Sequence, residues 1–151
     1  MKNTENVSMQ LTEIREVESI INKLPLSSEK IVFGKDLILG IGAKFKTDFD
    51  NEIMRIRFLV NYVMNETKEN IVKLETELTF KIKNLNRVVK VDNETNKINF
   101  QDNFLKTLIT ESIGTTRGIL FYKTKGTDLA NFPLPLIKAQ DLLNQMKKNK
   151  D

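Results

Sequence analysis

The chain has 151 residues, of which 40% are hydrophobic and 29% charged, and its formal net charge is +4. Such a length and composition predict one globular domain with a hydrophobic core of its own. The sequence contains no cysteine and no histidine, which excludes disulfides, the usual catalytic triads and nearly all zinc or haem sites. It also has no Gly-rich phosphate loop. We therefore expect a protein without catalytic residues, metal or cofactor.

The ends of the chain are polar. No stretch approaches the roughly 20 apolar residues of a membrane span, and residues 1–10 lack the apolar centre of a signal peptide, so we expect a cytoplasmic protein. The one basic run, residues 147–150, is typical of a solvated tail and not of a nucleic-acid-binding arm. The predicted organisation is a disordered segment over residues 1–6, a single domain over 7–147 and a basic tail over 148–151.

Residues 7–24 fit two interpretations. Val7, Met9 and Leu11 alternate as in a strand, whereas the later apolar residues also fit the spacing of a helix: Ile14, Val17, Ile20 and Ile21. We favour a strand up to about Val17. A connecting region follows Pro25 and includes a short apolar run over residues 31–33, which Gly34 closes.

Three further strands are predicted from Leu37 to Leu85. The first, residues 37–49, alternates and places Gly40 and Gly42 on the face opposite its apolar side chains. The next two form a hairpin around a polar turn at residues 65–70, with these apolar residues at every second position: Met54, Ile56, Phe58, Val60, Tyr62, Met64, Val72, Leu74, Leu78, Phe80 and Ile82. Apolar residues at every second position do not lie on one side of a helix, whose period is 3.6. The hairpin therefore has one buried face and one wet face.

The period changes to that of a helix after Gln101. The predicted long helix has Asp102 or Asn103 as its cap and ends before Gly126. Small residues interrupt its apolar stripe. This indicates either a helix that is poorly optimised for stability or close packing of the helix at an interface. Pro133 and Pro135 hold residues 127–136 in an extended crossover, and a second helix follows over residues 138–148. This order predicts an α+β fold, with a four-stranded antiparallel sheet (a meander) and the two helices on one face.

The C-terminal third resembles the SecB family of export chaperones. The residues that carry the resemblance are Arg117, Lys125-Gly126-Thr127, Phe132-Pro133-Leu134-Pro135-Leu136 and Asp141-Leu142-Leu143. The strand pattern extends the similarity to residues 37–145. The resemblance implies a SecB-like sheet with two helices, a homotetramer built as a dimer of dimers around the long helices, and ATP-independent holding of unfolded or precursor polypeptides.

The chain also departs from the family pattern. The export chaperones present an acidic sheet face that docks the ATPase SecA, whereas this chain is basic and has Lys73 where they place a docking glutamate. We therefore expect no SecA docking through this face. Some relatives guard an antitoxin, so the sequence leaves open whether the client is an exported precursor or such a dedicated partner.

The candidate residues follow from this resemblance and from the pattern of the crossover. The client-binding candidates are Phe45, Phe49, Phe132, Leu134, Leu136 and Ile137, and for each of them plain core packing is the alternative. The interface candidates on the long helix are Ser112, Thr115, Thr116 and Ile119. Two other functions stay open: a small-ligand-binding or hot-dog-like enzyme domain, and a structural subunit of a larger assembly. Hot-dog folds wrap their sheet around an early helix, whereas the helices predicted here come last.

Overall fold

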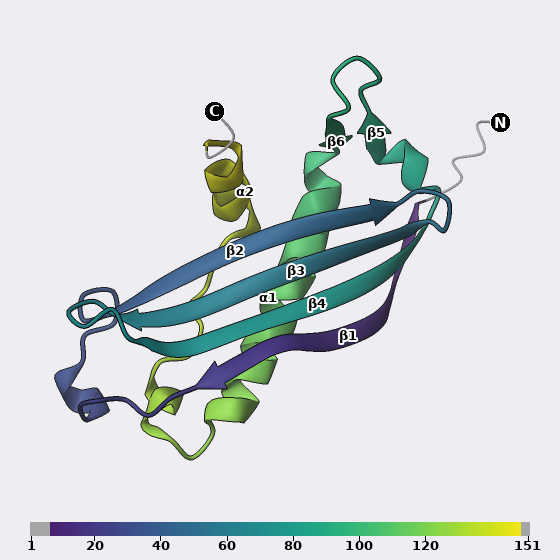
Figure 1. The fold of residues 1–151 in the computed structure, drawn as a ribbon. Helices are drawn as coiled ribbons and strands as arrows, with labels where there is room; N and C mark the ends of the chain where they lie inside the picture. The colour runs from purple at the N-terminus through teal and green to yellow at the C-terminus, as the bar shows by residue number, and fades with distance from the viewer. Residues whose placement is uncertain (1–6, 149–151) are drawn as a thin grey trace.

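The computed structural model describes residues 7–148, which form a four-stranded antiparallel sheet with two helices behind it (Figure 1). The strands are β1 (Ser8–Ile21), β2 (Leu37–Asp48), β3 (Ile53–Met64) and β4 (Asn70–Lys83). The helices are α1 (Asp102–Thr124) and α2 (Ala139–Lys148), and both lie on the same face of the sheet. The predicted α+β fold, with a long and a short C-terminal helix on one face, is confirmed.

The strand order in the sheet is β1-β4-β3-β2. Strands β2, β3 and β4 form a meander joined by two tight turns. Strand β1 does not pair with its neighbour in sequence, β2, but with the outer edge of β4. The connection over residues 22–36, which contains the short 3-10 helix η1 (Ser28–Lys30), carries the chain from one sheet edge to the other. Both edge strands therefore have one side without a partner strand among the described residues.

The core lies between the inner face of the sheet and α1. Alternate residues of β3, including Ile56, Phe58 and Val60, are fully buried, as the period of two predicts. One polar pair sits among them: the hydroxyls of Thr76 in β4 and Thr116 in α1 are 2.9 Å apart and hydrogen-bonded. Because each hydroxyl has a partner, the pair can be buried without leaving an unsatisfied group.

Strand β1 is longer than predicted. It continues past Val17 to Ile21, and its pairing with β4 shifts register twice, between Leu11 and Glu13 and between Glu16 and Glu18. Each shift inserts an extra residue and changes which side chains face the helices. Several apolar side chains of this edge strand remain exposed: Met9, Leu11, Ile14, Val17 and Ile20.

Two details of the connection into α1 differ from the prediction. The polar segment after β4 is not only a loop, because after the short 3-10 helix η2 (Leu85–Arg87) the strands β5 (Val89–Val91) and β6 (Ile98–Phe100) pair as a small ribbon. Gln101 occupies the cap position of α1 without a side-chain cap bond, so the predicted capping by Asp102 or Asn103 is wrong. The predicted stop is confirmed, since Gly126 follows the helix with φ of +80°.

Residues 1–6 and 149–151 lie outside the described part of the chain. The disorder predicted for residues 1–6 therefore remains a prediction. So does the basic tail predicted for residues 148–151, of which the structure describes only Lys148, the last residue of α2. Within residues 7–148, neither helix is both long and apolar enough to cross a membrane.

Candidate functional site

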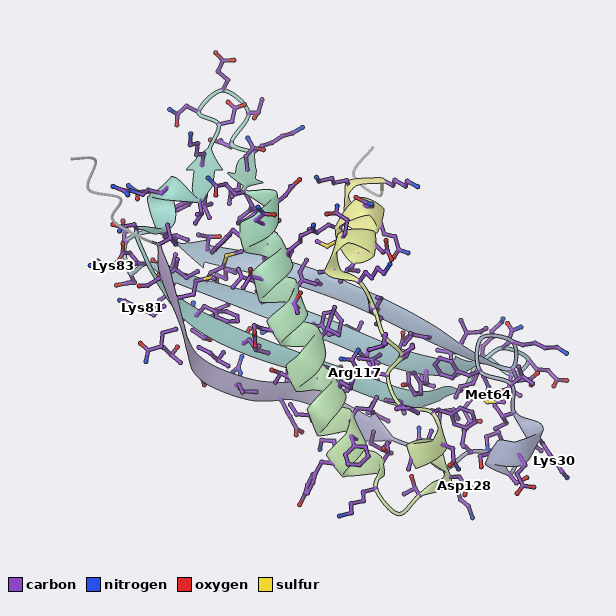
Figure 2. All side chains as sticks on the ribbon, turned by 180° about the vertical axis from the view of Figure 1, so that it is seen from behind. Lys30, Met64, Lys81, Lys83, Arg117 and Asp128 are labelled. Carbon is purple, nitrogen blue, oxygen red and sulfur yellow. The ribbon has the colours of Figure 1, made fainter. Side chains whose placement is uncertain are left out.

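An extended strap joins the two helices and crosses the helix side of the sheet. It covers residues 132–138, between the 3-10 helix η3 (Asp128–Asn131) and α2. Pro133 and Pro135 restrict the backbone to extended conformations and donate no N–H of their own. Figure 2 shows the strap running alongside α1, with Arg117 reaching toward it.

Arg117 fixes the strap to α1. Its Nε donates to the carbonyl oxygen of Leu134 at 3.1 Å, and its Nη2 donates to the carbonyl oxygen of Pro135 at 2.9 Å. Hydrogen bonds from a charged donor are stronger than neutral ones. A single side chain of α1 thus holds the middle of the strap.

An aromatic cluster holds the beginning of the strap. The ring of Phe132 stacks on Phe33 at 5.9 Å, and Phe33 meets Tyr62 of β3 edge to face at 5.3 Å. The Tyr62 hydroxyl donates to the carbonyl oxygen of Phe132 at 2.9 Å. Burial raises the pKa of the Tyr62 hydroxyl to about 12, against a smaller opposing effect of the Arg117 charge.

A hollow of about 320 Å³ lies where the strap leads into α2, and its exposed lining is about equally polar and apolar. It is lined by Phe45 from β2, Leu105 from α1, Leu143 and Met146 from α2, and the ribbon residues Ile98 and Phe100. The rings of Phe45 and Phe100 lie 5.9 Å apart. Three polar residues complete the lining: Asn99, Asp102 and Lys147. We call this cavity the α2 hollow.

The six predicted client-binding residues fall in different places. Phe45 lines the α2 hollow, and Phe49 is partly exposed in the turn between β2 and β3. In the strap, Leu134 is buried, Phe132 and Ile137 are half-buried against the core, and Leu136 is 95% exposed. The structure therefore brings Phe45 into a cavity and leaves Leu136 in solvent, while Phe132 and Leu134 pack within the chain.

The four predicted interface residues lie on two sides of α1. Ser112 and Thr116 are fully buried within this chain, where Ser112 donates to the Leu108 carbonyl oxygen and Thr116 meets Thr76. Thr115 and Ile119 are half-buried. Gly114 and Gly118 are exposed, with open space where a side chain would project. The small residues that a second chain can reach are therefore those around Gly114, Thr115 and Gly118.

Several residues of this region cannot be assigned from the sequence alone. Phe33 belongs to a short apolar run in a connection, and Phe100 ends a polar segment, so neither lies in a periodic pattern. Met146 belongs to the predicted apolar face of the second helix, but that pattern does not distinguish core from cavity. The two prolines of the crossover are the one sequence signal for the strap.

No protein-family model and no curated protein matches the chain. Among solved structures, it is similar to the Mycobacterium tuberculosis Rv1957 SecB-like chaperone, solved in complex with a ChAD peptide from the Rv1956 HigA1 antitoxin. That similarity has 12% identity and a TM-score of 0.47, over 85% of this chain and 89% of that one. A Streptococcus agalactiae protein of unknown function is similar over 87% of this chain and 98% of that one, with 10% identity and a TM-score of 0.43. Identity and TM-score are too low to assign a function from either structure.

Proposed function

We propose that this protein is an ATP-independent holdase that binds apolar segments of non-native polypeptides. The observation that carries the proposal is the α2 hollow, whose lining includes six large apolar side chains from four separate elements. Such a cavity binds by removing a client's apolar side chains from water. The resemblance of the crossover to the SecB family supports the same function.

The polar groups around the α2 hollow suit binding better than catalysis. Asp102 is the one carboxylate that lines the cavity, and it pairs with Lys147 at 3.3 Å. Acid–base catalysis needs a nucleophile, base or second acid within hydrogen-bonding reach. The lining offers only the Lys147 amine, which is already paired with Asp102 and is exposed to solvent. In this proposal the exposed pair of Asp102 and Lys147 orients a bound polypeptide and takes no part in a reaction.

In this proposal, one group of residues contacts the client and a second group holds the strap in place. Phe45 and Met146 both line the α2 hollow, and the flexible thioether of methionine adapts to differently shaped clients. Leu136 adds an apolar contact on the strap. Phe132 and Leu134 serve as anchors that hold the strap to the sheet and are not proposed to touch the client directly.

A charge placed in the α2 hollow tests the proposal. We expect Met146→Asp to lose most of the protein's ability to suppress aggregation of an unfolded client, because a carboxylate in an apolar cavity opposes burial of apolar side chains. Met146→Leu should retain that ability, since volume and polarity are nearly conserved. The readout is light scattering of a chemically unfolded client during dilution, with unfolding of each variant measured in parallel.

The matched control is Leu26→Asp, which adds the same charge at an exposed leucine that does not line the cavity. Equal loss of suppression in both aspartate variants, with both folded, would contradict the α2 hollow as the client site. Absence of suppression by the unaltered protein, against several unrelated clients, would contradict the holdase function itself. Polypeptides that co-purify from the native cell would distinguish an exported precursor from a dedicated client.

We also propose that the protein is a homo-oligomer, and the tetramer is the form that the sequence resemblance implies. The support is apolar surface on two neighbouring elements. Phe121 and Tyr122 of α1 are 60% and 80% exposed, and β1 exposes several apolar side chains. The pair between Lys123 and Glu16, at 2.9 Å, places the end of α1 beside β1. Exposed apolar side chains gathered on neighbouring elements are typical of an interface.

A further inference from the structure

The sheet face opposite the helices carries a block of four cations. Lys44 and Lys46 of β2 lie directly across from Arg57 and Arg55 of β3 in the antiparallel register. All four lie on the face turned to the viewer in Figure 1, because their neighbours Phe45 and Ile56 face the helices. They line a shallow hollow of about 560 Å³, together with Arg15, Phe45 and Glu77. We call these four residues the basic block.

The basic block is poorly neutralised by the chain itself. Within residues 7–148, neither Lys44, Lys46 nor Arg55 has a carboxylate oxygen within ion-pair distance. Arg57 does pair, donating from Nε to Glu77 at 2.7 Å, but Glu77 also accepts from Arg15 at 2.8 Å. Glu77 is thus shared by two guanidinium groups, and Glu75, the other carboxylate near Arg57, lies 3.9 Å from its Nη1. Hydrogen bonds from Asn51 are the main cause of the lowered pKa of Asp48, to which the charge of Arg55 adds a smaller contribution.

The arrangement works against the stability of the isolated sheet. Like charges that face each other directly across two strands repel, and the basic block contains two such pairs in succession, Lys44 with Arg57 and Lys46 with Arg55. Nothing in the packing of the sheet requires this, since the wet face accepts any polar residue. Repulsion of this kind is relieved when a negatively charged partner binds.

We propose that the basic block is a docking surface for an acidic polypeptide segment with carboxylates at alternate positions. Along a strand, residues two apart are separated by about 7 Å, which is the spacing of Lys44 from Lys46 and of Arg55 from Arg57. An extended segment repeats its own side chains at the same spacing, so successive carboxylates meet successive cations. Arginine additionally offers two parallel donors that match a carboxylate.

The same face argues for an acidic polypeptide over a nucleic acid. Single-stranded nucleic acids bind where several aromatic side chains stack on bases. Among the described residues that line the hollow beside the basic block, Phe45 is the single aromatic one, and its ring also packs against Phe100. The basic block is also bordered by carboxylates, among them Glu75, Glu77 and Asp48. These carboxylates limit the cationic area to the four residues of the basic block, which matches a short acidic segment better than a long phosphate backbone. The site lies on the opposite face from the α2 hollow and does not depend on the proposed holdase function.

Two double variants with equal charge change test this inference. Lys44→Ser with Lys46→Ser removes half of the basic block, and Lys35→Ser with Lys125→Ser removes two exposed lysines elsewhere. The probe is a labelled peptide of ten residues, with glutamate alternating with serine, whose binding is followed by fluorescence anisotropy at low and at moderate salt. We expect the unaltered protein to bind it in a salt-sensitive manner. The first double variant should bind about tenfold more weakly, the effect of losing two exposed ion pairs, and the second should bind normally.

Each other outcome would overturn the inference. Equal weakening in both double variants would mean that only the net charge matters. No measurable binding by the unaltered protein would mean that the surface takes no acidic segment. A single-stranded oligonucleotide of equal charge that binds more tightly than the peptide, and is lost in the first double variant, would make it a nucleic-acid surface. Folding of the variants is verified by thermal unfolding, where removal of the lysines should not lower the midpoint.

Discussion

At the scale of single residues, Tyr62 links the sheet to the strap. Its ring is fully buried and lies against Phe33, while its hydroxyl reaches the Phe132 carbonyl oxygen. A buried tyrosine normally finds a hydrogen-bond partner, because an unpartnered hydroxyl in an apolar environment is costly. That partner is here a backbone carbonyl of the strap, so the tyrosine contributes to both the core and the position of the strap.

The raised pKa of Tyr62 predicts a loss of stability at high pH. The folded state holds this proton up to about pH 12, whereas an unfolded tyrosine releases it near pH 10. Stability is therefore full below pH 10 and falls between pH 10 and 12, by roughly 2–3 kcal/mol for such a difference in pKa. We expect Tyr62→Phe to remove this part of the pH dependence, as measured by denaturant unfolding at pH 8, 10 and 11.

The matched control is Tyr122→Phe, which removes the hydroxyl of the other tyrosine, 80% exposed in the single chain. A change of the alkaline slope in Tyr62→Phe alone assigns that slope to Tyr62. At pH 8, Tyr62→Phe should also lose about 1 kcal/mol, because the Phe132 carbonyl oxygen loses its donor. An alkaline slope that is the same in Tyr62→Phe and in the unaltered protein would show that the hydroxyl does not titrate with unfolding.

At the scale of elements, the position of α2 depends on the strap. Helix α2 has ten residues, too few to be stable by itself in water. Its attachments are the buried residues Leu142 and Leu143, the exposed pair of Lys147 with Asp102, and the strap that Arg117 holds. Movement of the strap therefore changes the width of the α2 hollow.

Removal of Arg117 should loosen α2 more than it destabilises the sheet. In Arg117→Gln the carbonyl groups of Leu134 and Pro135 lose a charged donor, a loss of about 1.5–3 kcal/mol. We expect faster amide hydrogen exchange across residues 139–148, with little change in β3 and β4. The control is Lys123→Gln, which removes a surface ion pair of α1 with Glu16 and should cost less than about 1 kcal/mol. Uniformly faster exchange across the sheet would contradict a local role for Arg117.

The elements also show how far a sequence pattern determines this fold. Strands β2, β3 and β4 are predicted well, because each keeps an unbroken period of two against a single buried face. Strand β1 is ambiguous because its two register shifts interrupt that period. Its inward residues Leu11, Ile14 and Glu16 are spaced by three and then two, a mixture that resembles a helical stripe. The bulges belong to the pairing with β4, which local sequence does not encode.

The candidate site was less predictable than the fold for a related reason. The strap is visible in the sequence because proline restricts the backbone locally. The α2 hollow is formed by the four elements β2, β6, α1 and α2. An apolar residue in such a lining has the same pattern as one in the core. Phe45 is correctly identified as apolar on the helix side of the sheet, but only its tertiary neighbours Phe100 and Met146 decide that it faces a cavity.

At the scale of the whole molecule, three surfaces with different chemistry are kept apart. The α2 hollow lies on the helix side beside β2, the basic block lies on the opposite sheet face, and the exposed apolar residues of β1 and the end of α1 lie near the other sheet edge. An oligomer that uses the β1 edge would leave the other two surfaces free. Long apolar edge strands that are not covered promote aggregation, so pairing through this region also protects the protein.

The unaltered protein should therefore sediment as an oligomer at micromolar concentration, with a tetramer as the expected species. Phe121→Asp with Tyr122→Asp should produce a smaller species, because the change places two charges in the apolar surface. In a symmetric interface each substitution occurs once in each partner.

Thr116→Trp is a poor test, since Thr116 is buried against Thr76 and its enlargement would disturb the core. Leu26→Asp with Val32→Asp, at exposed positions in the connection between β1 and β2, provides the control with equal charge. A monomer in the unaltered protein, or equal dissociation in both double variants, would count against the β1 and α1 surface as the interface.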